Sequence, residues 1–114
     1  KRVNDQFGHA AGDRVIKAVA GVLVDKVRSY DQVVRWGGEE FLVCLPQTTL
    51  PDALKVAEKL RRAVEGITEP EQLTVSIGAC EIFTLQHLPQ AVGRADEALF
   101  KAKSGGRNQV CVLP

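Results

Sequence analysis

The sequence predicts an α+β domain of the ferredoxin-like type, in which helices pack on an antiparallel sheet. Helical and strand-like patterns follow one another along the chain in the order α-β-β-α-β-α-β. One further strand in front would complete the β-α-β-β-α-β order of the split βαβ unit. The chain has 114 residues, of which 45% are apolar, so it is long enough for one core. We therefore expect a single domain over residues 1–114 that lacks its N-terminal strand.

Net charge and cysteine content exclude several classes of protein. The net charge of +1 gives no basis for non-specific attachment to DNA, RNA or a membrane surface. No apolar run reaches the length that spans a bilayer, and no signal-peptide pattern opens the sequence. The three cysteines, Cys44, Cys80 and Cys111, are odd in number and lack a metal-binding spacing. They predict buried thiols in a reducing cytoplasm.

The first helix is predicted to begin at Gly12-Asp13. Its apolar residues recur at spacings of three and four and are expected to face the core: Ile16, Val19, Ala20, Leu23 and Val27. The segment Lys1–Asp5 in front of this helix carries neither a capping signal nor a breaker signal. We interpret this as a chain that starts one strand late within its domain.

Two strand-like runs then predict a β-hairpin. Asp31–Trp36 is rich in β-branched and aromatic residues, Phe41–Leu45 is apolar, and the four residues Gly37–Glu40 connect them. Glycine permits positive φ and lets another group approach the backbone closely. The adjacent carboxylates of Glu39 and Glu40 repel each other, and a divalent cation, which takes oxygen ligands, would remove that repulsion. For an isolated Gly-Gly-Glu-Glu the alternative is a solvated acidic turn.

The second helix is predicted from a start signal. Thr49 has the character of an N-cap, and the acidic Asp52 follows three residues later. The buried stripe of this helix is expected to consist of Ala53, Val56, Ala57, Leu60 and Val64.

The remaining elements are two strands and one helix. Leu73–Cys80 alternates as a strand does, and Gln109–Leu113 closes the chain as a strand. Between them a helix starts near Leu88 and ends at Ser104-Gly105-Gly106, because glycine is favoured just past a helix. Its inward face is expected to carry Leu88, Val92, Ala95, Leu99 and Ala102.

Five separated segments agree with one known family in its own order: Asn4–Asp13, Arg35–Phe41, Val75–Gly78, Ala95–Lys103 and Gly106–Asn108. On these segments the sequence resembles the GGDEF family, the diguanylate cyclases that join two GTP molecules into cyclic di-GMP. The resemblance covers essentially the whole chain. It implies a sheet related to the palm of nucleotide cyclases and polymerases. In the family, the first strand carries a metal-binding aspartate followed by Phe-Lys, and Lys1 matches that lysine.

The resemblance implies roles for the hairpin residues. Gly37 and Gly38 let the phosphates and ribose of GTP lie against the backbone. Glu39 matches the position that binds the catalytic metal, Mg²⁺ or Mn²⁺. Glu40 matches a position assigned either to metal binding or to activation of the 3′-hydroxyl, and both roles stay open.

Other matched positions imply contacts to the base and the phosphates. Asn4 and Asp13 match the pair that reads guanine, and a carboxylate suits the N1–H and N2–H₂ donors of that base. As isolated residues, Asp13 would be a helix N-cap and Asn4 a turn residue. Lys103 and Arg107, with Lys1 as a third, match phosphate-contacting cations. The alternative for Lys103 and Arg107 is favourable placement of positive charge at a helix C-terminus.

Arg28 and Asp31 match the family's inhibitory site, where cyclic di-GMP binds away from the active half-site. Arginine offers a planar fork that pairs with guanine O6 and N7 and stacks on a base. As an isolated pattern, Arg-x-x-Asp is a surface ion pair. The family often has another arginine where this chain has Lys59, which lacks the fork, and Arg61 or Arg62 on the same helix are the substitutes. Feedback binding is therefore expected to persist in weakened form.

The sequence thus predicts a diguanylate cyclase domain that converts two GTP into cyclic di-GMP and two pyrophosphates. Because each subunit holds one GTP, catalysis is expected to need a homodimer. A regulatory domain upstream is expected from the resemblance, in a cytoplasmic or membrane-anchored bacterial protein. The first alternative is a non-catalytic module that senses cyclic di-GMP or GTP, and the second is a dimerisation scaffold. Without the strand that carries the metal-binding aspartate, this chain alone is expected to turn over little GTP.

Overall fold

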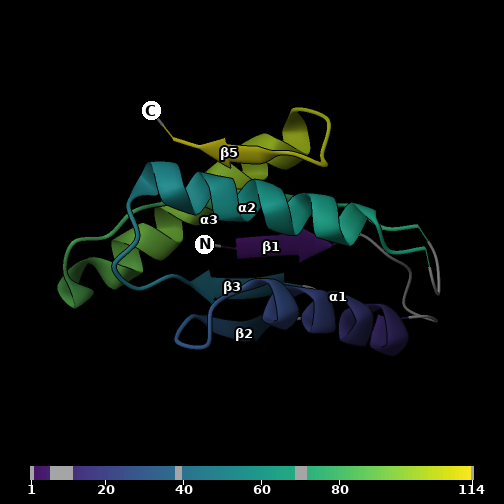
Figure 1. The fold of residues 1–114 in the computed structure, drawn as a ribbon. Coiled ribbons are helices and arrows are strands. Elements are labelled where there is room, and N and C mark those ends of the chain that lie inside the picture. The colour runs from purple at the N-terminus through teal and green to yellow at the C-terminus, as the bar shows by residue number, and fades with distance from the viewer. Residues whose placement is uncertain (1, 6–11, 38–39, 69–71, 114) are drawn as a thin grey trace.

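The computed structural model describes residues 2–5, 12–37, 40–68 and 72–113. It contains a five-stranded sheet and three α-helices (Figure 1). The elements in chain order are β1 (Arg2–Asp5), α1 (Gly12–Lys26), β2 (Gln32–Gly37), β3 (Glu40–Cys44), α2 (Leu50–Glu65), β4 (Val75–Ala79), the 3₁₀-helix η2 (Leu85–His87), α3 (Leu88–Ser104) and β5 (Val110–Val112).

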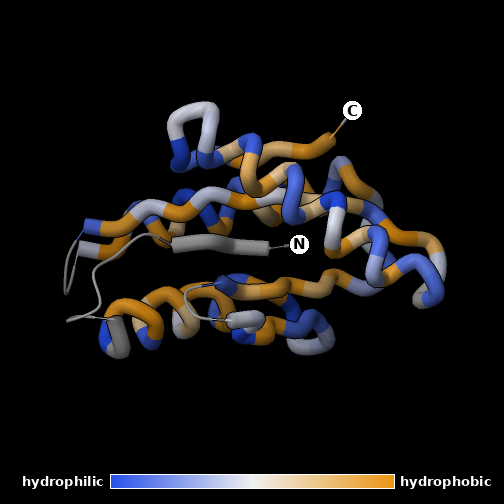
Figure 2. Tube along the Cα trace, turned by 180° about the vertical axis from the view of Figure 1, so that it is seen from behind, coloured by the Kyte–Doolittle hydropathy of each residue, from blue (hydrophilic) through white to orange (hydrophobic). Residues whose placement is uncertain are grey.

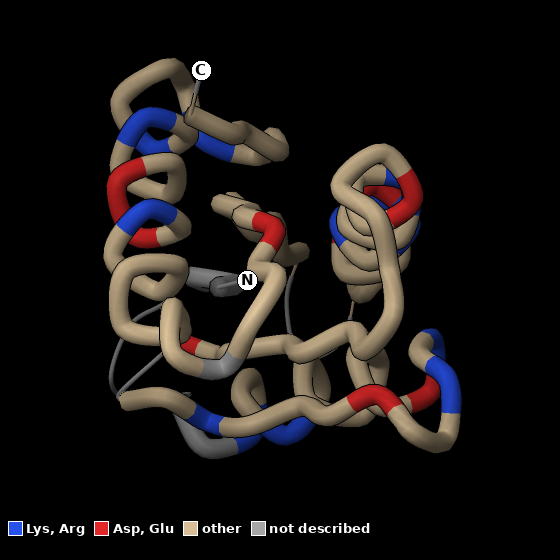
Figure 3. The backbone as a smooth tube through the Cα atoms, turned by 90° about the vertical axis from the view of Figure 1, so that its left-hand side faces the viewer, with Lys and Arg blue, Asp and Glu red and all other residues tan. Residues whose placement is uncertain are grey.

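The sheet has the strand order β2-β3-β1-β4-β5. All neighbouring strands are antiparallel except β4 and β5, which are parallel. Helices α1 and α2 cover one face, and α3 covers the other (Figure 3). This arrangement confirms the predicted α+β class with an antiparallel sheet and packed helices.

Strand β1 corrects the expectation that no strand precedes the first helix. It lies in the centre of the sheet, where Val3 is opposite Phe41 of β3 and Ile77 of β4. The facing edges of β3 and β4 present backbone donors and acceptors, and an extended segment between them satisfies these groups. Four residues are too few to show the alternation that reveals a strand in sequence.

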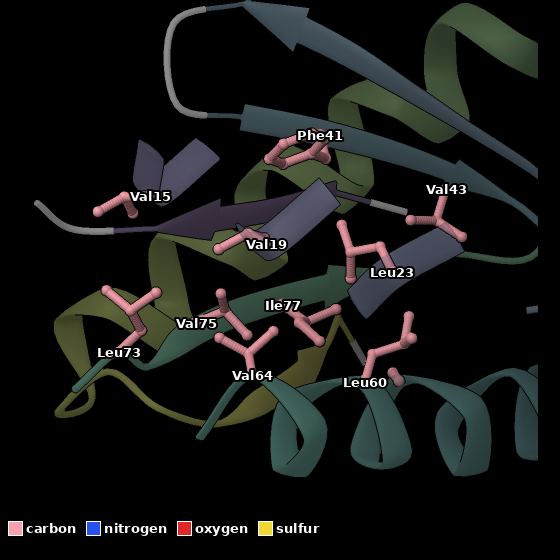
Figure 4. Close-up of a cluster of buried hydrophobic side chains, with 11 residues drawn as sticks. Val15, Val19, Leu23, Phe41, Val43, Leu60, Val64, Leu73, Val75 and Ile77 are labelled. Carbon is pink, nitrogen blue, oxygen red and sulfur yellow. The ribbon is translucent and has the colours of Figure 1, made fainter. Parts of the chain in front are cut away.

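Helices α1 and α2 pack as predicted, with small corrections. The core-facing residues of α1 are Val15, Val19 and Leu23, which are fully buried, whereas Ile16 and Ala20 are only partly buried (Figure 4). On α2 Val56 is only partly buried, and the other four predicted residues are buried: Ala53, Ala57, Leu60 and Val64. The side chain of Thr49 accepts a hydrogen bond from the Asp52 backbone nitrogen at 3.4 Å, which confirms the predicted N-cap. Figure 2 shows apolar residues alternating with polar ones along the helices.

Helix α3 has the predicted bounds, and Ala95, Leu99 and Ala102 are buried as predicted, whereas Val92 is only half-buried. Leu88 is 40% exposed, and the buried residues are Ala91, Ala95, Ala98, Leu99 and Ala102. These residues are mostly alanines because the helix lies directly on the backbone of β4. A Cβ atom at Gly78 would overlap the Ala95 carbonyl oxygen and the Leu99 backbone nitrogen. Gly78 is thus the position that lets α3 approach the sheet so closely.

The cysteines differ from the prediction of buried thiols. Cys44, Cys80 and Cys111 are free thiols, and each is half-buried. Cys44 ends β3 and Cys80 follows β4, so both lie where the sheet gives way to loops. In the described part of the chain, no helix has both the length and the apolar character needed to cross a bilayer.

Candidate functional site

The hairpin of β2 and β3 extends further than predicted. The pairing runs from Gln32 opposite Cys44 to Gly37 opposite Glu40, with an irregularity between Arg35 and Gly37. The register shifts after Arg35, and Gly37 then pairs with Glu40, so these two residues belong to the strands. The predicted connection of four residues is reduced to Gly38 and Glu39, which lie outside the described residues.

A row of backbone positions crosses the sheet beside this hairpin. Glu40 of β3 is opposite Asn4 of β1, and Asn4 is opposite Ser76 of β4. Glu40 is half-buried and Ser76 is buried. The structure thus brings two of the predicted site positions, Asn4 and Glu40, next to each other. For Asn4 and for Asp13, in the first turn of α1, only the backbone is described, and Lys1 lies outside the described residues.

The turn after α3 reaches the same edge of the sheet (Figure 1). Three consecutive residues have positive φ: Gly106 at 119°, Arg107 at 66° and Asn108 at 47°. The Asn108 backbone nitrogen donates to Ser76 Oγ at 3.1 Å, which ties this turn to the row described above. Arg107 is exposed, and Lys103 in the last turn of α3 is half-buried. The segment that bears the predicted phosphate-contacting cations, Lys103 and Arg107, is therefore bonded to β4 in the same row of residues that contains Glu40.

A charged cluster on α2, absent from our predictions, supports this turn. Arg61 donates to Glu58 at 2.8 and 2.6 Å and to Asn108 Oδ1 at 2.8 Å. The hydrogen bonds from Arg61, followed by those from Arg62, lower the pKa of Glu58 to about 2. The same bonds with Glu58 raise the pKa of Arg61. The spacing of Glu58, Arg61 and Arg62 signals ion pairs within a helix, but no sequence signal pairs Arg61 with Asn108, 47 residues away.

The predicted inhibitory residues, Arg28 and Asp31, are in direct contact. Arg28 Nε donates to Asp31 Oδ2 at 3.0 Å, and Nη2 donates to Oδ1 at 2.9 Å. The Arg28 backbone nitrogen also donates to Oδ2 at 2.8 Å, and the Asp31 side chain is only 2% exposed. Nη2 further contacts Thr48 Oγ1 at 2.8 Å, and the guanidinium carbon lies 4.5 Å from the centroid of the Tyr30 ring. The hydrogen bonds with Asp31 raise the pKa of Arg28.

The third predicted member of the inhibitory site lies on α2. Lys59 is exposed on α2, and none of the described contacts of Arg28 or Asp31 involves it. Arg61 and Arg62, the substitutes expected from the sequence, both pair with Glu58 on their own helix. Figure 3 shows the charged residues of α2 and of the turn between α1 and β2 as separate groups.

The two groups of predicted site residues lie at opposite ends of β2. Asp31 precedes the first residue of this strand, and Gly37 is its last. Six residues of strand span about 20 Å. A cavity of about 770 Å³ lies at the Arg28 end, lined in part by Cys44, Pro46, Thr48, Cys80 and Phe83. Pro46 and Thr48 line this cavity and also accept hydrogen bonds from Arg28.

The donor set for a metal ion is only partly described. Among the residues that the structure describes, no group of three or more His, Cys, Asp or Glu side chains is placed to hold a metal ion. The carboxylate of Glu40 is the donor that the structure places at the hairpin, and Glu39 is its neighbour in sequence. Carboxylate oxygens suit hard divalent cations, so the donor chemistry fits Mg²⁺ or Mn²⁺.

Comparisons with known proteins agree with this arrangement. PleD, a response regulator from Caulobacter vibrioides, is 42% identical over an alignment of 118 positions. The alignment covers 96% of this chain and 26% of PleD. The active GGEEF domain of a diguanylate cyclase from Vibrio cholerae superposes with a TM-score of 0.85 and 26% identity, covering 99% of this chain and 80% of that domain. The GGDEF domain of DgcB from Caulobacter crescentus, in complex with c-di-GMP, has a TM-score of 0.81 and 29% identity, over 96% and 74% of the two chains.

The family assignment rests on coverage of the whole domain. The chain spans about a quarter of the length of PleD, so the match concerns one domain of that relative. The family model described as "Diguanylate cyclase, GGDEF domain" matches residues 1–109. The chain therefore belongs to the GGDEF domain family of diguanylate cyclases.

Proposed function

We propose that this chain is the catalytic domain of a diguanylate cyclase, which condenses two GTP molecules into cyclic di-GMP and releases two pyrophosphates. The observation that carries the proposal is the row Glu40–Asn4–Ser76, joined at Ser76 by the turn that bears Arg107. This row and the turn bear three of the residues to which we assign roles: Glu40 as a carboxylate ligand, Asn4 as a base contact and Arg107 as a phosphate contact. The likeness to the active GGEEF domain supports the proposal, since this chain also has the sequence Gly-Gly-Glu-Glu-Phe.

In this proposal the hairpin carries the chemistry. The 3′-hydroxyl oxygen of one GTP attacks the α-phosphorus of the other, and the hydroxyl proton passes to the Glu40 carboxylate or to water. The bond from the α-phosphorus to the oxygen that bridges to the β-phosphorus breaks, and pyrophosphate leaves. The step occurs twice, once for each GTP. Glu39 and Glu40 would hold Mg²⁺ or Mn²⁺, which when bound polarises the α-phosphate and stabilises the developing negative charge. Gly37 and Gly38, without side chains, leave room for the nucleotide against the backbone.

The remaining residues of this site bind and orient the nucleotide. Asn4 and Asp13 read the donors of guanine, which selects GTP over ATP because adenine lacks that donor pair. Lys103 and Arg107, with Lys1, contact the phosphates through charge-assisted hydrogen bonds. Each domain holds one GTP, so two copies must face each other for the attack to occur.

At the other end of β2, Arg28 and Asp31 would bind cyclic di-GMP as a feedback inhibitor. The DgcB domain in complex with c-di-GMP supports binding of this ligand by a related domain. Lys59 supplies charge but no bidentate fork, which weakens the site. The alternative function, a non-catalytic sensor of cyclic di-GMP, is favoured by the well-ordered contacts of Arg28 and disfavoured by the presence of both Glu39 and Glu40.

The proposal is tested by GTP turnover in the full-length protein with Mg²⁺, with the product identified by mass. We expect cyclic di-GMP from the parent protein and none from Glu39→Gln, because the amide is a weaker ligand for a hard cation. Asp25→Asn, an exposed carboxylate on α1, is the matched control and should leave the product unchanged. Absence of product from a folded, dimeric parent protein would contradict the proposal and favour the sensor.

A further inference from the structure

The turn that presents Arg107 is held in an unfavourable backbone conformation. A helix end commonly places one residue, usually glycine, in the left-handed region. Here Arg107 and Asn108 follow Gly106 in that region, with φ of 66° and 47°. Residues with a Cβ atom lose stability there, so the surroundings must hold them in place. Asparagine tolerates this conformation better than most residues, which suits position 108.

Asn108 is anchored by all of its polar groups except its carbonyl. Its side-chain Oδ1 accepts from Arg61 Nη1 at 2.8 Å, and Nδ2 donates to Glu65 Oε2 at 2.8 Å. Its backbone nitrogen donates to Ser76 Oγ at 3.1 Å. One residue of the turn is therefore tied both to α2 and to β4.

Arg61 is itself a fixed anchor. Its side chain is only 14% exposed, and two hydrogen bonds to Glu58 orient the guanidinium. Nε and Nη2 are engaged by Glu58, so Nη1 is the nitrogen that donates to Asn108, and it also lies 3.6 Å from Glu65 Oε2. Neighbouring Arg62 also binds Glu58, at 2.9 Å, but its side chain is 74% exposed and has no described contact with Asn108.

Arg107 combines a fixed backbone with a free side chain. Its backbone nitrogen donates to the Ala102 carbonyl at 2.9 Å, and the next residue is the anchored Asn108. Within the described part of the chain, no hydrogen bond or ion pair is made by the Arg107 guanidinium, which is exposed. Because the backbone of Arg107 is already fixed, binding an anion orders the side chain but costs no backbone freedom, which favours affinity.

We propose that Asn108 and Arg61 are positioning residues that aim Arg107 at the phosphates of the nucleotide. This inference rests on the proposed function, in which Arg107 contacts those phosphates. The competing explanation is that the cluster of Glu58, Arg61, Glu65 and Asn108 only fastens the end of the chain to α2. The two explanations differ in whether the effect of the cluster on binding depends on Arg107.

The first test compares two ligands in the full-length protein with Mg²⁺ by titration calorimetry. The ligands are guanosine and the α,β-methylene analogue of GTP, which cannot release pyrophosphate. Asn108→Gly keeps the positive φ accessible but removes the side-chain bonds to Arg61 and Glu65. We expect it to bind the triphosphate about tenfold more weakly, as loss of one well-directed charged contact would predict, and to bind guanosine unchanged.

A double-mutant cycle with Arg107→Gln decides between the explanations. In the Arg107→Gln background, Asn108→Gly should cause no further loss of triphosphate affinity. Arg61→Gln should reproduce the loss of Asn108→Gly, and its matched control Arg62→Gln should bind like the parent, because only Arg61 reaches Asn108.

The outcomes separate this inference from the proposed function. Equal loss from Asn108→Gly with and without Arg107, or equal loss for guanosine and the triphosphate, would show a fastening role and overturn the inference alone. If Arg107→Gln binds the triphosphate as the parent does, the phosphate contact itself is absent and both proposals about Arg107 fall.

Discussion

Two arginines at opposite ends of the sheet are held in opposite ways. Arg28 has a side chain fixed by Asp31, Thr48 and the ring of Tyr30. Arg107 has an exposed side chain, but its backbone is fixed in the left-handed region by the groups around it. The guanidinium of Arg28 is therefore fixed by its contacts, whereas for Arg107 only the backbone is fixed.

This difference corresponds to different demands on binding. At Arg28, Nε and Nη2 of the guanidinium already donate to Asp31. A ligand there must therefore bind the remaining donors of the guanidinium or stack on its plane. A ligand at Arg107 meets a guanidinium that surrenders no described contact on binding. We infer that the Arg107 end suits a substrate that binds and leaves in each cycle. The Arg28 end suits a regulatory ligand with a defined shape.

The largest expected effect on stability comes from Gly78, which lies beneath the helix that runs between the two ends. Helix α3 runs from the cavity end of the sheet, at Leu88, to the Arg107 end, at Ser104. Gly78→Ala would push this helix off β4, because the added Cβ overlaps the backbone of Ala95 and Leu99. We expect a loss of about 3 kcal/mol or more in the free energy of unfolding, measured by urea denaturation.

Gly93→Ala is the matched control within α3. A Cβ atom at Gly93 meets nothing within 4 Å, so alanine there should stabilise the helix by about 0.5–1 kcal/mol. If the Gly78→Ala and Gly93→Ala variants unfold at the same urea concentration, α3 does not pack as closely on Gly78 as described.

An effect of intermediate size is expected when the free energies of unfolding of variants at the two arginine sites are compared. Asp31→Ala removes a carboxylate that is 2% exposed and accepts three hydrogen bonds from Arg28. We expect a loss of about 1–3 kcal/mol, because the Arg28 backbone nitrogen and guanidinium lose their partner. Arg107→Gln should change stability by less than about 0.5 kcal/mol, since its side chain is exposed. Thermal unfolding of both variants measures the difference, and equal losses would contradict it.

The smallest effect concerns pH and the cluster that anchors Asn108. The pKa of Glu58 is about 2 in the folded protein, below its ordinary value of 4.5. The stability from this depressed pKa is present above about pH 4.5 and is lost as the pH falls toward 2. The Glu58 side chain is 41% exposed, so solvent screening keeps the contribution below about 1 kcal/mol.

Urea unfolding at pH 6 and pH 3 of the parent and of Glu58→Gln measures this contribution. The parent should be more stable than the variant at pH 6, and the gap should narrow at pH 3. A gap of the same size at both pH values would show that the ion pairs of Glu58 do not stabilise the fold.

The sequence predicted the long elements well, because their patterns are long. Helix α2 has a capping threonine and four buried residues at helical spacing, and all of these were predicted correctly. Strand β1 was missed because four residues without alternation carry no strand signal, and its place is set by pairing with β3 and β4. The inward face of α3 was predicted in part, since Leu99 and two alanines are buried as expected whereas Leu88 is 40% exposed. Ala91 and Ala98 were missed, because the burial of such small residues depends on the close approach at Gly78.

The candidate sites were predictable where the residues are close in sequence. The ion pair of Arg28 and Asp31 was expected for this spacing, because three residues bring both side chains into one turn, and their role as an inhibitory site stays a prediction. Lys59 was assigned to the same site by alignment, and no described contact joins it to Arg28 or Asp31. The bond between Arg61 and Asn108 could not be predicted, because it depends on how α2 lies against the turn after α3.

We propose that GTP is turned over at the Arg107 end of the domain and that the product is bound at the Arg28 end. The most direct test is the initial rate of GTP turnover by the full-length protein, with and without added cyclic di-GMP, for Arg107→Gln and Arg28→Gln. We predict that Arg107→Gln lowers the rate but keeps the same fractional inhibition by product. Arg28→Gln should turn over GTP at a rate that added product does not change. If product inhibits Arg28→Gln as strongly as the parent, or if Arg107→Gln loses the inhibition, the assignment of separate tasks to the two ends is wrong.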